Sequence, residues 1–387
     1  MKLHFNPLFL LGIASFNCEP LLFSDCQELH DLPQEAYEYH VLNAMDKAAE
    51  DIPFVESDDP DLEKMIQPFV LETKKIEITC CPGAFNPTIT RWNGGILLGF
   101  RIRNLKTGAT NQIGLNWMDE NFNLLGPAQL LNMPVGHLCE VSKLQDPRLI
   151  SIDDRLYVSF SEMMEGVFDR DIRRMYVAEV IHDGKYFHTN NPSCFTSYEG
   201  ENPQRWEKNW ITFDYNGNLM MIYSPIPHRI FRPLLGKGKC ETIASSWASV
   251  QWPWGQLRGG TPALKIGNEY LSIFHSSKYM KSKQSLGKNI AHYFMGAYTF
   301  SAEPPFEITR ISKTPIVGKD FYNGPAYKTW KPLRVVFPCG LIADDNYLWI
   351  AYGKQDYEIW IAKIDKKALL ESLVPVTSII ETKNENP

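Results

Sequence analysis

From residue 84 onward, the chain repeats one pattern of hydrophobic and polar positions five times. Each repeat has a short polar or Gly/Pro-containing start, a strand of alternating apolar residues, a tight turn and a second apolar strand. Alternation with a period of two is typical of strands with one buried face, so the pattern predicts five hairpins. The five stretches are FNPTITRWNGGILLGFRIR (85–103), QDPRLISIDDRLYVSFSE (145–162), EKNWITFDYNGNLMMIYSP (207–225), GGTPALKIGNEYLSIFHSS (259–277) and VFPCGLIADDNYLWIAYGK (336–354).

The residues at the centre of each repeat suit hairpin turns, because Asn, Asp and Gly tolerate the positive φ angles that such turns require. The predicted turns are Asn93-Gly94, Asp153-Asp154, Asn216-Gly217, Gly267-Asn268 and Asp344-Asp345. Further strand-like runs lie between the repeats, at residues 111–125, 173–187, 289–300 and 358–365.

Five sheet units without helical crossovers predict an all-β fold, a five-bladed β-propeller over residues 77–370. A β-sandwich also contains short alternating strands, but the fivefold repetition favours the propeller. In a propeller the first strand of each blade lines a central channel. The starts of these strands and the ends of the hairpins should therefore converge at one end of the channel.

The segments that flank the propeller carry no predicted chemistry. Residues 1–24 begin with one Lys and an apolar stretch, which resembles a signal peptide and favours a secreted or periplasmic location over a cytoplasmic one. Residues 25–76 form an acidic, partly helical N-terminal extension, and residues 371–387 form a C-terminal tail. No later run approaches the ~20 apolar residues that a membrane span needs.

Composition narrows the function classes. The net charge is −6 with no long basic run, which argues against a nucleic-acid partner. The eight cysteines include no CxxC spacing, so we expect no metal site and leave the redox state open. Aromatic residues make up 12% of the chain; they fill sheet interiors and also line carbohydrate sites.

The predicted end of the channel gathers ionisable residues. A carboxylate, cations and imidazoles in one concavity favour acid–base chemistry, although each charge taken alone is explained as simply by a neighbouring partner or by solvent. The strand starts contribute Asn86, Asp146, Glu207, Lys208 and Arg258, and the hairpin ends contribute Arg101, Arg103, Glu162, His228, His275 and Asp356.

Two further motifs are best explained by packing. Gly259-Gly260 suits a close approach of backbone at a strand start better than a phosphate-binding loop, because no helix evidently follows it. Met220 and Met221 are expected in the core, one on each face of a strand between neighbouring blades.

Five motifs in order carry a family resemblance: FNPTI, QDPRL, EKNW, RGGTP…FHSS and VFPCG…YGKQD. Together they resemble the blade signatures of glycoside hydrolase family 130, the β-mannoside phosphorylases and mannosidases. They are also similar to a related family of β-1,2-mannosyltransferases and phosphorylases described in protozoa. The resemblance covers roughly residues 77–365.

The resemblance implies roles for specific residues. Asp146 of the DPR motif would be the general acid, relaying its proton through a sugar hydroxyl to the glycosidic oxygen. Arg101, Arg103, Lys208 and His228 would hold inorganic phosphate, the nucleophile of the phosphorylases, and Asp356 would bind sugar hydroxyls. Gln145 departs from the family pattern, in which an acidic residue often precedes the DPR motif.

These features predict an inverting β-mannoside phosphorylase that transfers a mannosyl unit between a glycan and phosphate. It would need no cofactor, with inorganic phosphate as co-substrate. The alternatives are a β-mannosidase, a β-1,2-mannosyltransferase and a non-catalytic glycan-binding propeller. Hydrolysis would need a second carboxylate about 6.5–9.5 Å from the acid, for which Glu207, Glu162 and Asp356 are candidates.

Overall fold

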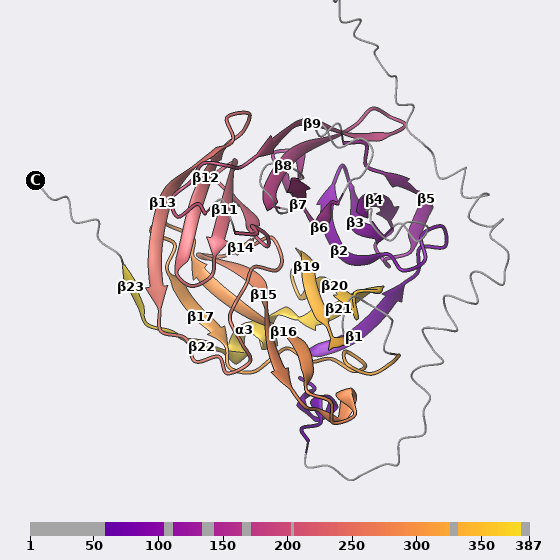
Figure 1. Cartoon of the computed structure of the whole chain (residues 1–387), viewed down its shortest axis with the longest axis vertical. Coiled ribbons are helices and arrows are strands. Elements are labelled where there is room, and N and C mark those ends of the chain that lie inside the picture. Colours follow the sequence, from indigo (N-terminus) through magenta and orange to yellow (C-terminus); the bar gives the residue numbers. More distant parts are fainter. Residues whose placement is uncertain are drawn as a thin grey trace, which may run out of the picture.

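The computed structural model describes residues 59–103, 111–133, 143–164, 172–202, 205–325 and 332–380. Its strands form five antiparallel sheets around a common centre, with each sheet as one blade (Figure 1). Helical structure in these residues is confined to short segments: η2 (Leu62–Met65), η3 (Lys283–Ser285) and α3 (Lys366–Ser372). The predicted all-β, five-bladed propeller is confirmed.

The first two blades each contain four strands in sequence order. Blade one consists of β2 (Phe85–Trp92), β3 (Gly95–Arg103), β4 (Asn111–Met118) and β5 (Leu124–Leu130). Blade two consists of β6 (Gln145–Ile152), β7 (Arg155–Met164), β8 (Ile172–His182) and β9 (Phe187–Cys194).

The third and fourth blades are extended by strands from the C-terminal part of the chain. Blade three consists of β10 (Ile211–Tyr215), β11 (Asn218–Ser224), β12 (His228–Leu234), β13 (Lys239–Ala248) and β23 (Ser378–Ile380). Blade four consists of β14 (Leu264–Ile266), β15 (Glu269–Met280), β16 (Ile290–Ser301), β17 (Ile308–Ser312) and β22 (Leu373–Pro375), with β18 (Leu333–Arg334) beside β16.

The fifth blade closes the ring with strands from both ends of the propeller. It consists of β19 (Val336–Ala343), β20 (Tyr347–Lys354), β21 (Glu358–Asp365) and β1 (Val70–Ile76). The N-terminal strand β1 pairs with β21 as the outermost strand, so the chain's two ends are joined within one sheet. Blades one and five also pack directly on each other through a shared apolar cluster.

The five predicted hairpins are the inner two strands of the five blades. The turn between β2 and β3 has φ angles of 47° at Asn93 and 77° at Gly94, as the turn chemistry requires. The first strands of successive blades contact one another around the centre, with β2 against both β6 and β19. The starts of these strands therefore lie together, as predicted.

Apolar side chains fill the spaces between neighbouring blades. Met220 packs in the cluster between blades three and four, while Met221 packs in the cluster between blades two and three. The prediction that these adjacent residues occupy opposite faces of one strand is confirmed. Because both faces of each blade are covered, the inner strands are almost continuously buried.

The two predicted flanks differ from the structure at their inner boundaries. Strand β1 falls within the range assigned to the acidic extension, yet it belongs to blade five; strands β22 and β23 fall within the predicted tail, yet they extend blades four and three. Short outer strands have weak patterns of their own and depend on the neighbouring strand for their backbone hydrogen bonds. The predicted signal peptide, residues 1–24, lies outside the described residues. Within the described part of the chain, no helix has the length and apolar character that a membrane crossing needs.

Candidate active site

Three successive blades begin with the same backbone feature. Asn86, Asp146 and Asn209 have left-handed φ angles of 49°, 55° and 64°. The strand register is interrupted beside the first two, between Phe85 and Thr88 and between Gln145 and Arg148. Asn and Asp tolerate this conformation better than most residues, and strained backbone of this kind often occurs at functional sites. All three side chains line one cavity.

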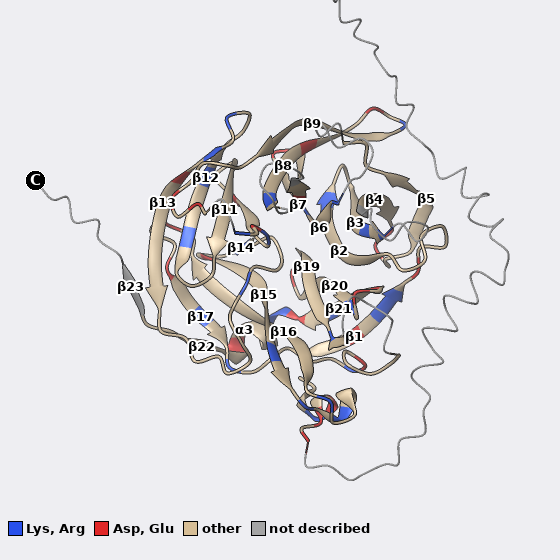
Figure 2. Cartoon of the chain, in the orientation of Figure 1, with Lys and Arg blue, Asp and Glu red and all other residues tan. Residues whose placement is uncertain are grey.

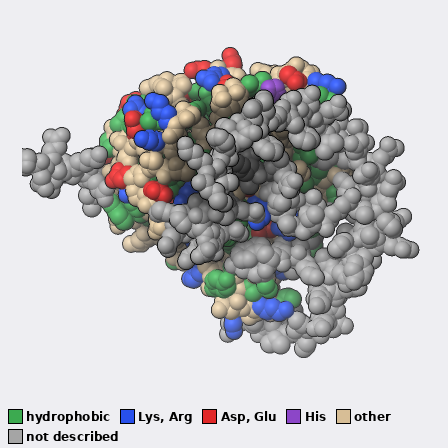
Figure 3. Space-filling view, turned by 45° about the horizontal axis from the view of Figure 1, so that its top comes forward, with side chains coloured by type: hydrophobic (Ala, Val, Ile, Leu, Met, Phe, Trp, Pro, Cys, Tyr) green, Lys and Arg blue, Asp and Glu red, His purple; other side chains and the backbone are tan. Residues whose placement is uncertain are grey.

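The cavity has a volume of about 610 Å³, and residues from all five blades line it. In Figure 3, basic and acidic side chains lie together deep in the hollow of this face. The lining residues are Asn86, Arg101, Arg103, Gln145, Asp146, Met163, Arg173, Trp206, Lys208, Asn209, Arg258, His275, Tyr293, Phe337 and Asp356. Eight of the eleven residues predicted at this end of the channel are among them; Glu162, Glu207 and His228 are not.

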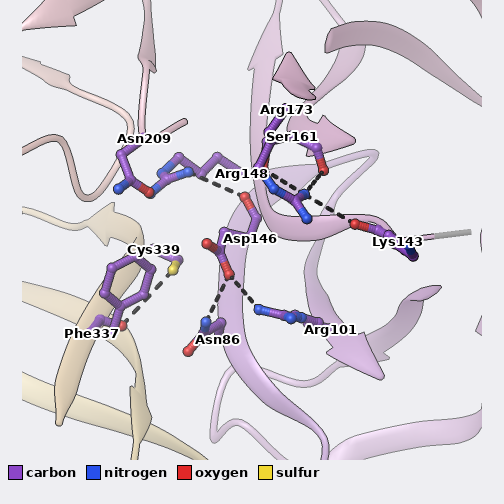
Figure 4. A network of polar contacts seen from close by, with 10 residues as sticks. All are labelled: Asn86, Arg101, Lys143, Asp146, Arg148, Ser161, Arg173, Asn209, Phe337 and Cys339. Carbon is purple, nitrogen blue, oxygen red and sulfur yellow. Dashed lines mark hydrogen bonds and ion pairs between the residues drawn. The ribbon is translucent and has the colours of Figure 1, made fainter. Parts of the chain in front are cut away.

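Asp146 is buried within a set of hydrogen-bond donors. Its Oδ1 accepts a hydrogen bond from Nδ2 of Asn86 at 2.8 Å and forms an ion pair with Nη1 of Arg101 at 3.3 Å (Figure 4). Burial alone would raise the pKa of this carboxyl, but the charges of Arg101, Lys208 and Arg148 and the Asn86 hydrogen bond lower it to about 2. In the unliganded protein Asp146 is therefore ionised at neutral pH.

Arg148, the last residue of the DPR motif, ties three blades together around Asp146. Its Nη1 donates to the backbone carbonyl of Asp146 at 3.2 Å, and its Nη2 donates to Oδ1 of Asn209 at 3.2 Å (Figure 4). Its Nε donates to the carbonyl of Gly260 in blade four. A buried guanidinium with three backbone or amide partners holds the backbone of Asp146 in place.

Gly260, whose carbonyl accepts the hydrogen bond from Arg148, and the preceding Gly259 both lie in close contact with backbone, as predicted. A Cβ at Gly259 would lie 2.0 Å from the carbonyl oxygen of Asn209, and one at Gly260 would lie 2.1 Å from that of Ile273. Both distances are shorter than any real contact, so only glycine fits at these two positions.

Cations outnumber carboxylates in the cavity. Among the described lining residues, five cations (Arg101, Arg103, Arg173, Lys208 and Arg258) accompany two carboxylates (Asp146 and Asp356), which leaves a formal charge of +3 with His275 neutral. In Figure 2, basic residues lie on β1 and β12, away from the channel, and also on β3; Arg101 and Arg103 at the end of β3 line the cavity.

The cations repel one another within this space. Burial lowers the pKa of Lys208, and the charges of Arg173, Arg101 and Arg258 lower it further, against the opposing effect of Asp146. Burial and the charge of Arg101 likewise lower the pKa of Arg103. Because these buried cations repel one another, binding of an anion among them would be electrostatically favourable.

Arg173 and Gln145 complete the cationic wall. Nη1 of Arg173 donates to the carbonyls of Lys143 and Ser161 at 3.1 and 3.2 Å (Figure 4). With its side-chain oxygen turned toward the arginines, Gln145 accepts from Nη2 of Arg173 at 3.2 Å and from Nη2 of Arg101 at 3.1 Å. Gln145 thus fixes two guanidinium groups without neutralising their charge.

His275 contributes a neutral imidazole. Its Nδ1 lies 2.7 Å from the carbonyl oxygen of Gly259, and its ring stacks on Tyr293 at 6.1 Å. Burial lowers its pKa to about 3, so it does not add to the positive charge at neutral pH. With Nδ1–H donating to the carbonyl, Nε2 is left as an acceptor.

Glu207 and His228 lie away from the cavity, which corrects their predicted placement. Glu207 is buried, accepts a hydrogen bond from Nε1 of Trp210 at 3.0 Å and pairs with Arg205. Consecutive residues of an extended segment point in opposite directions, so Lys208 faces the cavity and Glu207 faces away. His228 begins the third strand of its blade, beyond the channel, and its Nδ1 lies 2.7 Å from the carbonyl oxygen of Phe306.

Of the three carboxylates predicted as a possible hydrolytic base, two lie outside the cavity. Glu162 is buried and accepts hydrogen bonds from the backbone nitrogens of Lys143 and Met163, both at 2.9 Å. It does not line the cavity. Of the three candidates, only Asp356 does. Among the described residues, no group of three or more His, Cys, Asp or Glu side chains is placed to bind a metal ion.

Comparison with known protein families agrees with this geometry. The family model for glycoside hydrolase 130, described as β-1,4-mannooligosaccharide phosphorylase, matches residues 58–374. The chain belongs to glycoside hydrolase family 130. It is therefore a carbohydrate-active enzyme that acts on glycosides. No curated protein sequence matches the chain.

Solved structures with a similar fold include a glycosyl hydrolase and a mannoside phosphorylase. A glycosyl hydrolase from Bacteroides ovatus is 16% identical, with a TM-score of 0.55 over 82% of this chain and 96% of that one. The β-1,2-mannobiose phosphorylase from Listeria innocua is 16% identical, with a TM-score of 0.52 over 82% and 98%. At such identities the likeness establishes the fold alone.

Several cavity residues of this family 130 protein were missed from the sequence. Asn209 had a usable signal, because it stands two residues before β10, where the two preceding blades place Asn86 and Asp146 near their strand starts. Arg173 had a weaker signal, as one of two adjacent arginines at the start of β8, which continues with a mainly apolar run. For Trp206 and Tyr293, the only signal in the sequence was the 12% aromatic content of the chain.

Proposed function

We propose that this family 130 protein is an inverting β-mannoside phosphorylase that transfers a mannosyl unit between a glycan and inorganic phosphate. The observation that carries the proposal is the cluster of five cations lining the cavity of Asp146. A neutral mannoside offers no negative charge to balance them, whereas a phosphate dianion does. Arginine supplies paired donors and lysine a point charge, both of which suit phosphate.

In this mechanism each group has one task. The deep mannosyl unit binds beside Asp146, with its hydroxyls also held by Asp356. Phosphate, held by Arg101, Lys208 and neighbouring arginines, attacks the anomeric carbon from the face opposite the leaving group. The bond from that carbon to the glycosidic oxygen breaks as the new bond to a phosphate oxygen forms, which inverts a β-mannoside to α-mannose 1-phosphate.

The proton on Asp146 depends on the bound anion. A general acid must carry a proton, yet its cationic neighbours keep Asp146 ionised in the unliganded protein. Phosphate dianion offsets these charges, which raises the proton affinity of Asp146 once the nucleophile is bound. Over the whole reaction, the proton of HPO₄²⁻ is transferred to the released glycan through Asp146 and a sugar hydroxyl.

Hydrolysis on the same scaffold is the second candidate, and Asp356 is the observation in its favour. It is the remaining carboxylate among the described lining residues, so it would have to activate the water. A phosphorylase needs no such base, because phosphate is itself the nucleophile.

The test is incubation of the purified protein with β-1,2- and β-1,4-mannobiose, with and without phosphate, followed by identification of the products. Phosphorolysis predicts α-mannose 1-phosphate only when phosphate is present. Free mannose alone in phosphate-free buffer would favour hydrolysis, and dependence on a sugar nucleotide would favour a transferase. Asp146→Asn should abolish turnover while glycan binding survives; binding without turnover in the unaltered protein would indicate a glycan-binding module.

A further inference from the structure

Trp206 is exposed at the mouth of the cavity, although tryptophan is among the most apolar side chains. It is 51% exposed, while Asp146, which lines the same cavity, is only 6% exposed. A single exposed tryptophan is common on protein surfaces and needs no explanation. Trp206 differs because its ring forms part of the wall of the cavity that holds Asp146 and the five cations, and it stands beside two of those cations.

Two cations of the site lie close to the Trp206 ring. Nζ of Lys208 is 5.7 Å and Cζ of Arg173 is 5.9 Å from ring centroids of Trp206. Both distances are within the range of cation–π attraction, which offsets part of the repulsion between these two charges. The indole is therefore held beside the cationic wall, and an apolar surface adjoins the proposed phosphate position.

Because Trp206 is exposed and Asp146 is buried, the two residues indicate which sugar of a bound glycan lies at each end of the cavity. The mannosyl unit that reacts must reach Asp146 at the buried end of the cavity. The remaining sugars then extend toward the open end, where Trp206 lies. Aromatic rings present a flat apolar surface to which the C–H face of a pyranose is complementary.

We propose that Trp206 is the platform for the leaving-group sugar, and thus a specificity-determining residue for the length of the glycan. This inference rests on the proposed phosphorylase function, in which the same sugar is the acceptor when the reaction runs in reverse. Phosphate and mannose 1-phosphate bind deeper, at the cations and Asp146, and make little use of this ring.

The experiment measures KM for each substrate separately in both directions. In Trp206→Ala, KM for mannobiose in phosphorolysis, and for the acceptor sugar in synthesis, should rise about 10-fold. KM for phosphate and for mannose 1-phosphate should change less than 2-fold. Trp206→Phe, which keeps an aromatic face, should fall in between. Trp247→Ala is the matched control, because Trp247 is 48% exposed on β13 and does not line the cavity.

Two outcomes for the Michaelis constants would overturn the inference. If KM for phosphate rises while KM for the glycan is unchanged, Trp206 serves only to place Lys208 and Arg173. If no KM changes in Trp206→Ala, the ring contacts no sugar. If the unaltered protein releases no mannose 1-phosphate, the proposed function fails separately. Calorimetric titration with mannotriose, in the unaltered protein and in Trp206→Ala, then tests the platform by binding alone. Equal affinities would exclude it.

Discussion

The side-chain amide of Asn86 donates a 2.8 Å hydrogen bond to the carboxylate of Asp146, and the two residues begin the inner strands of neighbouring blades in the same left-handed conformation. A repeated backbone feature thus supplies both the proposed acid, Asp146, and the amide that orients its carboxylate. Because Asn86 can donate to the ionised carboxylate, it contributes to the low pKa of Asp146.

Asn86→Asp replaces this donor by a second carboxylate of almost the same shape. Two carboxylates at hydrogen-bond distance cannot both ionise easily, so the pair should bind a proton at higher pH. The alkaline limb of the kcat profile, measured at saturating mannobiose and phosphate, should move upward by about one pH unit. An unchanged profile would contradict a role for Asn86 in setting the proton affinity of the acid.

Gln145→Glu tests whether the cavity's charge selects the anion. The new carboxylate would pair with Arg101 and Arg173, which now donate to a neutral amide, and would lower the net charge of the cavity by one. KM for phosphate should rise about 10-fold, the equivalent of ~1.4 kcal/mol, with a smaller effect on the glycan. Gln145→Met, which removes the hydrogen bonds without adding charge, is the control; an equal effect in both variants would argue against the electrostatic explanation.

Gly353→Ala should disturb Asp146 indirectly, by displacing its hydrogen-bond donor Asn86. A Cβ at this position would lie 2.2 Å from Oδ1 of Asn86 and 2.9 Å from its backbone nitrogen, so Asn86 must move. We expect kcat to fall at least 10-fold, with a loss of about 1–3 kcal/mol in the free energy of unfolding.

Gly94→Ala is the matched control for the loss of a glycine. Its φ of 77° makes alanine unfavourable by about 1–2 kcal/mol, but nothing lies within 4 Å of the added Cβ. Stability should fall while kcat stays unchanged. A comparable loss of activity in both variants would show that general destabilisation, rather than displacement of Asn86, is the cause.

His228 and His275 should make the protein less stable in mild acid. Burial lowers their pKa values to about 4 and about 3, from 6.5. Between pH 6.5 and about 4 the unfolded chain therefore binds protons that the folded chain does not, so stability falls as the pH falls. Each histidine contributes a slope of up to about 1.4 kcal/mol per pH unit.

The measurement is the free energy of unfolding in urea at several pH values between 6.5 and 4.5, for the unaltered protein and for His228→Gln. The variant is expected to lose some stability at neutral pH, since Nδ1 of His228 lies 2.7 Å from the carbonyl oxygen of Phe306. Its dependence on pH should be weaker by the slope of about one proton. Parallel curves for the two proteins would mean that His228 is protonated in the folded state.

Local patterns predicted the inner hairpins well, because alternation and turn residues act over a few positions. The turn at Asn93-Gly94 and the opposite faces of Met220 and Met221 follow from the local sequence alone. Strand β1 was placed outside the propeller, because its partner β21 lies almost 300 residues away and nothing local marks the pairing. Trp206 was missed for a similar reason, since the local sequence does not distinguish a tryptophan beside a cavity from one elsewhere on the surface.

By itself, the sequence determined the five-bladed repeat, the turns between inner strands and the residue types at each strand start, since these depend on short-range backbone preferences. Only the tertiary structure decided which of those side chains meet. Lys208 faces the cavity, while the adjacent Glu207 accepts a hydrogen bond from Trp210. Arg173 reaches the cavity from β8, the third strand of blade two. The direction of a side chain depends on strand register and on left-handed residues such as Asp146, and both are settled by pairing between distant parts of the chain.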